Sequence, residues 1–529
     1  MSTVLPRRLM RAGIAMVGVA GLAMGLSACS GTSAEGGSAG KGDENLTLQF
    51  RGTPISLDPA FQGTASGSVF TVLAYDPLIY QAADGSLQPS LATEWEFTDE
   101  SYTTFELTLR DDVEFASGEP FTAESVKNSV EYFLDADAAN AARVGEIEDV
   151  EVVDPTTVRF HYADPFSGAP FSMTQTVMMG NIIGPDGLSD PDSLLLEMDG
   201  AGQYTYNSAE SVPESSYVYD RNDNYWNPDA QMWDRITVDV IGDPNAVLNA
   251  ASTGQIDFGL GSALLAGSAE DAGLDVLTAP FYNWELRLLD MAGEVNPALA
   301  DERVRHAIAL AVDRESIVNA LGGDYMSVSD QMVAPGVDGH DDSLGWDHDP
   351  DAARDLLAEA GYPDGFEMTI VDSSQQDYES RIAQAVASSL GEVGIDVTIE
   401  VDAVSIPSFN EKLESGEFEA SLWASNGTVG NTYQSFRFQD GASNPFGFSD
   451  DTMEALYEQS LVVDGEERTE VYQQMNERWQ ELAYTVPILT EHYVNYAGPR
   501  VTNIKSSAAN PVMLPVGPRP EDNWQPTGE

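Results

Sequence analysis

The densest group of side chains that could bind a metal lies in one short segment. It holds two histidines and three aspartates within nine residues, namely His340, Asp341, Asp342, Asp347 and His348. Imidazole and carboxylate groups of this kind suit hard and borderline divalent metals. Because the whole chain is acidic and Gly339 and Gly345 lie nearby, we interpret the segment as a solvated loop. We predict no metal site and no cofactor.

A second possible metal motif begins at Asp220. The run 220–224 (DRNDN) resembles the start of a calcium-binding loop. Such a loop needs a glycine at its sharp turn and a bidentate glutamate at its end. Tyr225 occupies the first of these positions and Gln231 the second. We therefore reject a calcium site at this position.

Motifs of the common enzyme classes are absent from the sequence. It has no Walker motif, no Gly-x-Ser-x-Gly and no His-Glu-x-x-His, and the glycines at 259 and 261 lack the third glycine of a dinucleotide fingerprint. The 87 acidic residues give too many chance pairs for catalytic carboxylates to be judged from spacing. We predict no catalytic residues, which favours a binding protein over an enzyme.

The single cysteine, Cys29, ends an N-terminal targeting segment. A basic stretch up to Arg11 precedes a short apolar run from Ala12 to Gly25, which is the pattern of a secretory signal. The following Leu-Ser-Ala-Cys at 26–29 resembles a bacterial lipobox, which implies that residues 1–28 are removed and Cys29 is lipidated. An ordinary signal with a chance cysteine is the alternative. Residues 29–44, rich in Gly, Ser and Ala, read as a flexible tether.

Composition excludes several partners. The chain has 529 residues, of which 42% are hydrophobic, so it has enough apolar material for large folded cores. It carries 87 Asp and Glu against 24 Lys and Arg, a formal net charge of −63. Such a chain repels phosphates, so we predict binding neither to nucleic acid nor to an anionic lipid surface. We interpret the acids as a solvated surface.

The elements that must position a binding site change character along the chain. Residues 45–280 are rich in strands, with a hairpin over 150–162 and a helix that begins at Thr122. Residues 295–485 alternate between helix and strand, and 366–371, 377–393 and 395–401 form a βαβ unit with a parallel pair. The predicted fold class is therefore α/β.

One loop in this second region is a binding candidate by topology. The strand predicted at 418–424 is followed by Ser425, Asn426 and Gly427. Ligands of open α/β sheets bind beyond the carboxyl ends of strands. An ordinary surface loop is the alternative.

Several strings together resemble the peptide/nickel solute-binding family of ABC importers. They include Leu57-Asp58-Pro59-Ala60 and Leu91-Ala92-Thr93-Glu94-Trp95, and later the runs 105–115, 221–226, 254–257 and 304–314 in the family's order. The resemblance covers about residues 45–529. It implies a bilobed periplasmic-binding-protein-like fold of type II, with the extra subdomain of the oligopeptide-binding group and a ligand cleft between two hinged lobes.

The resemblance also implies a domain organisation. Lobe I comprises 45–283 together with a C-terminal return at 491–529, and lobe II comprises 284–490. The chain is expected to cross between the lobes near Phe281–Leu289 and Val486–Asn495. Ligand is held in the cleft by hinge closure and is then passed to a membrane permease with cytoplasmic ATPases.

Peptide-binding members of this family carry a Trp-x-x-Asp element whose carboxylate holds the α-ammonium of the ligand. In this chain Trp423-Ala424-Ser425-Asn426 matches in position, but Asn426 replaces the acid. A neutral amide gives none of the charge-assisted stabilisation that a buried ammonium needs. Either another acid supplies the charge, or the ligand is a blocked peptide, a sugar or another neutral or anionic solute.

Further ligand-binding candidates lie near the expected crossings and strand ends. The aromatic candidates would line the cleft and the arginines would pair with anions, although core packing or surface exposure is the alternative for each. The full predicted set is Arg51, Gly52, Trp284, Trp423, Asn426, Gly427, Tyr433, Phe436 and Arg437.

The predicted function is a monomeric, lipid-anchored receptor on the outer face of the cytoplasmic membrane that captures peptides or peptide-like solutes for an ABC importer. Within that class, the alternative is a receptor for a carbohydrate or a nickel or other metal chelate. Nickel is less favoured because no histidine lies next to Trp423. From other classes, the alternatives are an extracytoplasmic hydrolase and a sensory lipoprotein.

Overall fold

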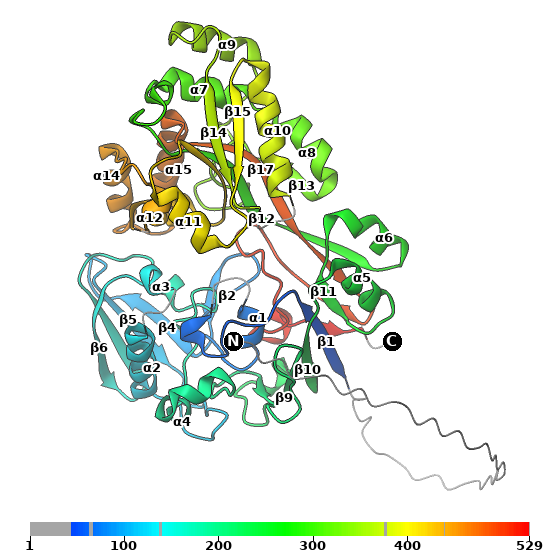
Figure 1. Ribbon diagram of the computed structural model, residues 1–529. Helices are drawn as coiled ribbons and strands as arrows, with labels where there is room; N and C mark the ends of the chain where they lie inside the picture. Colours follow the sequence, from blue (N-terminus) through cyan, green and yellow to red (C-terminus); the bar gives the residue numbers. More distant parts are fainter. Residues whose placement is uncertain (1–43, 63–66, 137–139, 375–377, 439, 528–529) are drawn as a thin grey trace, which may run out of the picture. The chain divides into compact units, whose positions relative to one another are not determined.

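The computed structural model describes residues 44–62, 67–136, 140–374, 378–438 and 440–527 (Figure 1). Residues Asp43–Glu529 form one compact unit. The predicted signal peptide, Cys29 and nearly all of the predicted tether lie outside the described residues.

The largest sheet has the strand order β15-β14-β16-β12-β17-β11-β1-β10-β9-β8, with β13 paired to β17. Parallel and antiparallel pairs are mixed in it, since β14 lies parallel to β15 and β1 to β10, whereas β12 lies antiparallel to β17. Its strands are β1 (Asn45–Phe50), β8 (Tyr204–Tyr206), β9 (Ser216–Arg221), β10 (Arg235–Val240), β11 (Phe258–Leu260), β12 (Asp275–Leu288), β13 (Met326–Val328), β14 (Glu367–Asp372), β15 (Asp396–Val401), β16 (Ala420–Ser425) and β17 (Thr485–Ala497).

Two long strands, β12 and β17, run through the middle of this sheet (Figure 1). They pair from Asp275 with Ala497 to Arg287 with Thr485, and the register shifts between Pro280 and Tyr282 and again between Trp284 and Glu285. At one end β17 pairs with β11, and at the other end β12 pairs with β16. The chain between them, 289–484, therefore leaves and returns through neighbouring strands.

Helices pack on the β14–β15–β16 part of the sheet. Its core contains Leu286, Ile370 and Leu422 from the strands and Ile308 and Val386 from the helices, all fully or almost fully buried. The predicted βαβ unit is confirmed by β14, α10 and β15. The helices of this part are α7 (Glu302–Ala311), α8 (Arg314–Leu321), α9 (Pro350–Glu359) and α10 (Glu379–Glu392).

A second core of the same region lies against the other helices of the 289–484 segment. Aromatic rings of Trp479, Tyr484, Tyr433 and Phe436 meet in it with centroids 4.8 to 6.0 Å apart. The helices that supply it are α11 (Ile406–Glu414), α12 (Val429–Phe438), α13 (Asp440–Ser443), α14 (Asp451–Ser460) and α15 (Gly465–Leu482).

A separate four-stranded sheet has the order β4-β5-β7-β6. Its strands are β4 (Ala92–Phe97), β5 (Thr104–Leu109), β6 (Ile147–Asp154) and β7 (Thr157–Tyr162), and β6 and β7 confirm the predicted hairpin. Helix α2 (Ala123–Asp135) packs on it, and its N-terminus is fixed by reciprocal hydrogen bonds between Thr122 and Ser125. Phe105, Phe160 and Val126 are buried in this core.

The C-terminal segment packs on the core around β1. Trp524 is 1% exposed, its ring lies 4.4 Å from that of Phe258, and its carbonyl accepts the indole N–H of Trp233. Leu46 and Leu48 of β1 belong to the same cluster. Residues distant in sequence therefore share one core.

Candidate functional site

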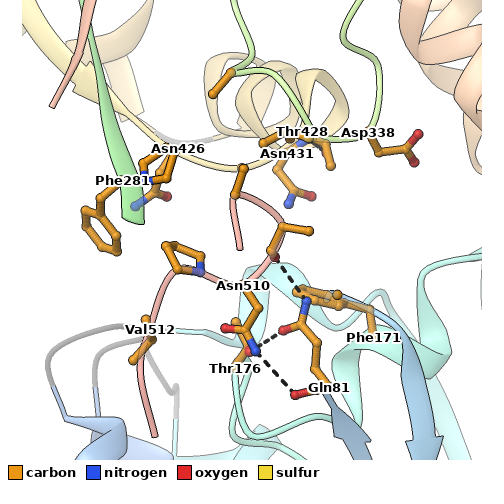
Figure 2. A pocket seen from close by; sticks show the side chains of 18 of the residues that line it. Gln81, Phe171, Thr176, Phe281, Asp338, Asn426, Thr428, Asn431, Asn510 and Val512 are labelled. Atoms are coloured by element: carbon orange, nitrogen blue, oxygen red, sulfur yellow. Dashed lines mark hydrogen bonds between the residues drawn. The ribbon is translucent and has the colours of Figure 1, made fainter. Parts of the chain in front are cut away.

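A cavity of about 280 Å³ is lined by residues from both regions of the chain (Figure 2). One wall, here the 426–431 wall, is formed by Asn426, Gly427, Thr428 and Asn431 from the connection between β16 and the start of α12. The facing wall, here the Gln81 wall, is formed by Gln81, Arg143, Phe171, Gln175, Thr176 and the segment 508–512. The β12 residues Pro280, Phe281 and Asn283 also line the cavity.

The 426–431 wall exposes unused amide groups. Gly427 has a φ of +96°, a conformation that favours glycine, and it turns the chain from β16 into α12. The hydroxyl of Thr428 accepts the backbone N–H of Asn431 at 3.3 Å, which holds the first turn of the helix. Among the described residues, the carboxamides of Asn426 and Asn431 make no hydrogen bond, so they are available to a ligand.

The Gln81 wall is held by its own hydrogen bonds. Gln175 donates its amide N–H to the carbonyl of Gln81 at 2.7 Å, and the hydroxyl of Thr176 donates to Oε1 of Gln81 at 2.7 Å. Asn510 donates to the carbonyls of Gln81 and Ala82 at 3.3 and 3.1 Å (Figure 2). These contacts fasten the C-terminal segment to β2 (Ile79–Gln81) and fix the shape of this wall.

The β12 side of the cavity is set by the register shift. The ring of Phe281 stacks on Tyr493 of β17 with centroids 3.7 Å apart and an interplanar angle of 13°. The amide of Asn283 donates to the carbonyl of Met332 at 3.0 Å and accepts the hydroxyl of Thr490 at 2.6 Å. Asn283 is thus occupied by the protein.

Charge at the cavity is sparse for so acidic a chain. Of its described lining residues, only Arg143 and Asp338 are charged. The carboxylate of Asp338 accepts the hydroxyl of Thr469 at 2.5 Å and lies 4.0 Å from the guanidinium of Arg468. Figure 2 shows this carboxylate directed away from Asn431 and Asn510. The one charged acid of the described lining therefore accepts a hydrogen bond from the protein and has an arginine beside it.

A buried ion pair lies on β12, which pairs with β16, the strand that leads to the 426–431 wall. Glu285 and Arg287 of β12 are 1% and 7% exposed, and their N···O distance is 2.8 Å. The guanidinium of Arg287 lies 4.3 Å from the ring centroid of Trp423. Burial raises the pKa of Glu285, and the charge and hydrogen bond of Arg287 oppose that rise. The pair positions Trp423 and the end of β16.

The structure brings only part of the predicted site to the cavity. Asn426 and Gly427 line it, whereas the other predicted residues do not appear among its lining residues. Trp423 is half-buried beneath Arg287. Arg51 and Gly52 follow β1, and Arg51 is exposed. The side chain of Arg437, in α12, lies outside the described residues.

Three predicted aromatic residues are core residues in the structure. Trp284 is 1% exposed, and its indole N–H donates to Glu491 at 2.8 Å. Tyr433 and Phe436 are 3% and 7% exposed, and α12 turns both toward Trp479. Their packing, the alternative considered for each from the sequence, is the arrangement observed.

Most residues around the cavity carry no recognisable sequence signal. Gln81, Arg143, Phe171 and Asn510 come from segments that are far apart in the chain and belong to no motif. Phe281 and Asn283 fall inside a predicted crossing. The asparagines and glutamines of the lining become visible as a group only once the fold places them together.

The region 340–348 is a surface loop in the structure. His340 contacts the carbonyl of Val333 at 3.1 Å and the carboxylate of Asp342 at 3.2 Å. Within the described ranges, no three His, Cys, Asp or Glu side chains are grouped so that they could hold a metal ion. A search of the same ranges for a helix both long and apolar enough to cross a bilayer finds none.

Comparison with known proteins identifies the class to which this fold and cavity belong. Residues 86–446 match the model of the bacterial extracellular solute-binding proteins, family 5 (middle region). The chain belongs to this family, whose members are the substrate-binding receptors of ABC transporters. The predicted family and the predicted bilobed α/β fold are thus confirmed.

Relatives in sequence include glutathione-binding proteins GsiB. The protein from Salmonella typhi is 26% identical over 355 residues, covering 65% of this chain and 67% of its own. The protein from Escherichia coli O6:K15:H31 is 23% identical over 478 residues, and the match covers 85% of this chain and 90% of that protein.

Solved structures share the fold. CtaP from Listeria monocytogenes has a TM-score of 0.78 at 20% identity, covering 92% of this chain and 100% of its own. NikA from Brucella suis, in complex with Fe(III)-EDTA, has a TM-score of 0.77 at 23% identity, and the match covers 92% of this chain and 100% of NikA. DppA from Helicobacter pylori, in complex with the peptide STSA, has a TM-score of 0.70 at 21% identity, and the match covers 89% of this chain and 98% of DppA.

The buried pair generates a prediction about stability. We expect Arg287→Gln to lower the free energy of unfolding by about 3–5 kcal/mol near neutral pH, because Glu285 is left as an uncompensated buried charge. Loss of the guanidinium raises the pKa of Glu285 further above its unfolded value. The carboxyl is then tolerated while protonated and becomes destabilising as pH rises through its folded-state pKa, so the deficit should shrink on acidification.

Urea unfolding of wild type and variant between about pH 5 and pH 8 measures this deficit. Arg303→Gln is the matched control, since Arg303 is 47% exposed and pairs with Asp301 at the surface, and it should change stability little at any pH. A deficit for Arg287→Gln that is independent of pH, or no larger than that of the control, would contradict the assignment.

Proposed function

We propose that this protein is a lipid-anchored receptor that captures peptide-like solutes outside the cell and delivers them to an ABC permease by closure of two lobes. Residues 1–28 are its signal peptide, Cys29 is its lipidated residue and 29–44 is its tether. It acts as a monomer at the outer face of the cytoplasmic membrane and performs no catalysis. The observation that carries the proposal is the cavity between the 426–431 wall and the Gln81 wall.

The division into lobe I (45–283 and 491–529) and lobe II (284–490) is supported by the cores. One pair of hydrophobic clusters draws its residues from 284–489, and the clusters around β1 and the four-stranded sheet draw theirs from 46–258 and 497–524. The cavity takes residues from both sets. In the proposed mechanism, closure brings these two walls together around the solute and removes it from water.

The hinge of this motion is proposed to lie in β12 and β17. Only these strands link the two sets of cores within the large sheet, and the register shift at Pro280 and Tyr282 interrupts their ladder beside the cavity. A bulge leaves a residue outside the regular pairing, so the strands bend more easily there. Phe281, at the bulge, is positioned to sense closure because it lines the cavity.

A peptide-like ligand is favoured by the chemistry of the lining. Carboxamides both donate and accept hydrogen bonds, as peptide groups do, and Asn426 and Asn431 offer theirs opposite the apolar surfaces of Phe171 and Val512. Relatives named glutathione-binding proteins and a structural neighbour bound to a peptide support the same ligand class. A metal-chelate receptor is the second candidate, supported by the neighbour that holds Fe(III)-EDTA.

Asn426 generates a test of ligand class. If its amide faces the amino end of a bound peptide, Asn426→Asp should tighten binding of peptides with a free N-terminus by about tenfold, because a carboxylate adds a charge-assisted hydrogen bond to an ammonium. N-acetylated versions of the same peptides should gain nothing. Calorimetry and thermal melting with a mixture of tri- and tetrapeptides measure both, since a ligand at a hundredfold excess over Kd adds about 2.7 kcal/mol of stability.

The matched control is Asn249→Asp, which adds the same charge on an exposed position of α5 (Pro244–Ser252) and should leave every affinity unchanged. If neither wild type nor Asn426→Asp binds any peptide of the mixture, the peptide assignment is refuted. Equal gains for free and acetylated peptides would show that residue 426 does not meet an ammonium.

The anchor is tested separately in cells. Cys29→Ser removes the thiol that would carry the lipid, so we expect the protein to lose incorporation of a labelled fatty acid and to move from the membrane fraction to the soluble extracytoplasmic fraction. The wild-type protein should retain both properties. Membrane retention of the serine variant would contradict lipidation at Cys29.

A further inference from the structure

Arg143 is the cationic residue of the described cavity lining, and backbone hydrogen bonds fix the position of its main chain. Arg143 ends the short 3₁₀ turn Ala141–Arg143 that follows α2, and its backbone N–H donates to the carbonyl of Asn140 at 2.9 Å. Asn140 is 5% exposed, and its amide donates to the carbonyl of Gln62 at 3.2 Å. The base of Arg143 is thus fixed, and its half-buried side chain lines the cavity.

The guanidinium of Arg143 makes neither an ion pair nor a hydrogen bond with any described residue. Two more deeply buried arginines of this chain do hydrogen-bond to the protein, although Nη2 of Arg314 has no partner among the described residues. Arg287 pairs with Glu285, and Arg314 donates to the carbonyls of Pro487 and Ala309. With 87 acids against 24 basic residues, carboxylate partners are abundant. Since none of them lies against Arg143, its N–H donors remain unused by the described residues at the cavity lining.

Burial alone lowers the pKa of Arg143, since no neighbouring charge opposes that effect. A guanidinium that has lost water without gaining a partner is costly, and a ligand carboxylate that accepts two parallel N–H bonds would remove that cost. Arginine matches carboxylate geometry in this bidentate way. The cation is therefore arranged for an anion that arrives with the ligand.

The rest of the cavity offers little negative charge with which a ligand cation could pair. Asp338 is engaged by Thr469 and Arg468, and the 426–431 wall presents only neutral amides. Among the described lining residues, a ligand ammonium would find only the carboxylate of Asp338, which lies beside Arg468 and is directed away from Asn431 and Asn510. The cavity is consequently suited to a solute whose charge inside it is negative.

We propose that Arg143 anchors a carboxylate of the transported solute and that the receptor thereby selects anionic solutes, with their uncharged end against Asn426 and Asn431. This inference rests on the proposed function, because it takes the cavity to be the solute site. It narrows the ligand to a carboxylic acid whose amino end, if it has one, is blocked or lies outside the cavity. A local cation is needed for such a ligand because the field of a chain with net charge −63 repels anions.

The test uses matched acids and amides. The probes are a mixture of N-acetylated tri- and tetrapeptides with free carboxyl termini, the same mixture as C-terminal amides, and glucuronate beside glucuronamide. Bound masses are read by native mass spectrometry and affinities by calorimetry. We expect only the acid members to bind. Arg143→Gln should lower the affinity for them by at least about tenfold, which is the effect expected for loss of one charge-assisted hydrogen-bonded pair. Arg143→Lys should retain part of the affinity.

Arg354→Gln is the control, since Arg354 is 47% exposed on α9 and pairs with Asp351. It should bind like wild type, and unchanged melting of all variants excludes misfolding. Binding of the peptide acids identifies a peptide carboxylate, and binding of glucuronate alone identifies a sugar acid. The inference is overturned if amides bind as tightly as acids, or if Arg143→Gln keeps wild-type affinity for the acids. If no probe binds to any form of the protein, the cavity is not the solute site, and the proposed role of Arg143 in binding a carboxylate is refuted with it.

Discussion

The pairing of β12 with β17 is the constraint on which the rest of the structure depends. This ladder joins strands that are about 200 residues apart in sequence, from Asp275 with Ala497 to Arg287 with Thr485. It returns the chain to the core around β1, where Trp524 is buried, and so places 508–512 beside Gln81. Without the pairing of β12 with β17, the two walls of the cavity would not be brought opposite each other. The register shift in the same ladder brings Phe281 to the cavity.

Charge is distributed so that the cavity differs from the rest of the molecule. The chain carries −63, yet the described lining holds one engaged acid and one unpaired arginine among amides and apolar side chains. Glu285 and Arg287 form a buried ion pair within the fold, whereas Arg143 at the cavity pairs with no described residue. Recognition in this account comes from neutral hydrogen-bonding groups and a single cation.

Local structure was largely predictable because local signals are strong. Alternating hydrophobic residues and the turn at 154–155 define the hairpin β6–β7, and Asp349 with Pro350 defines the start of α9. The loop at Asn426 and Gly427 was predictable from its place after a strand. Arg143, Gln81 and Asn510 were not, because only long-range packing places them together. Trp284, Tyr433 and Phe436 are aromatic residues near predicted crossings and strand ends, which suggests a cleft lining, but hydrophobic burial draws them into cores.

The central claim, that the cavity between these walls holds a small solute, is tested most directly by native mass spectrometry of the protein that begins after Cys29, purified from an extracytoplasmic compartment. We expect a bound mass excess of small, carboxylate-bearing, peptide-like molecules that is released on unfolding. A protein found only at its bare polypeptide mass, which also takes up none of the peptides or acids added to it, would contradict the account.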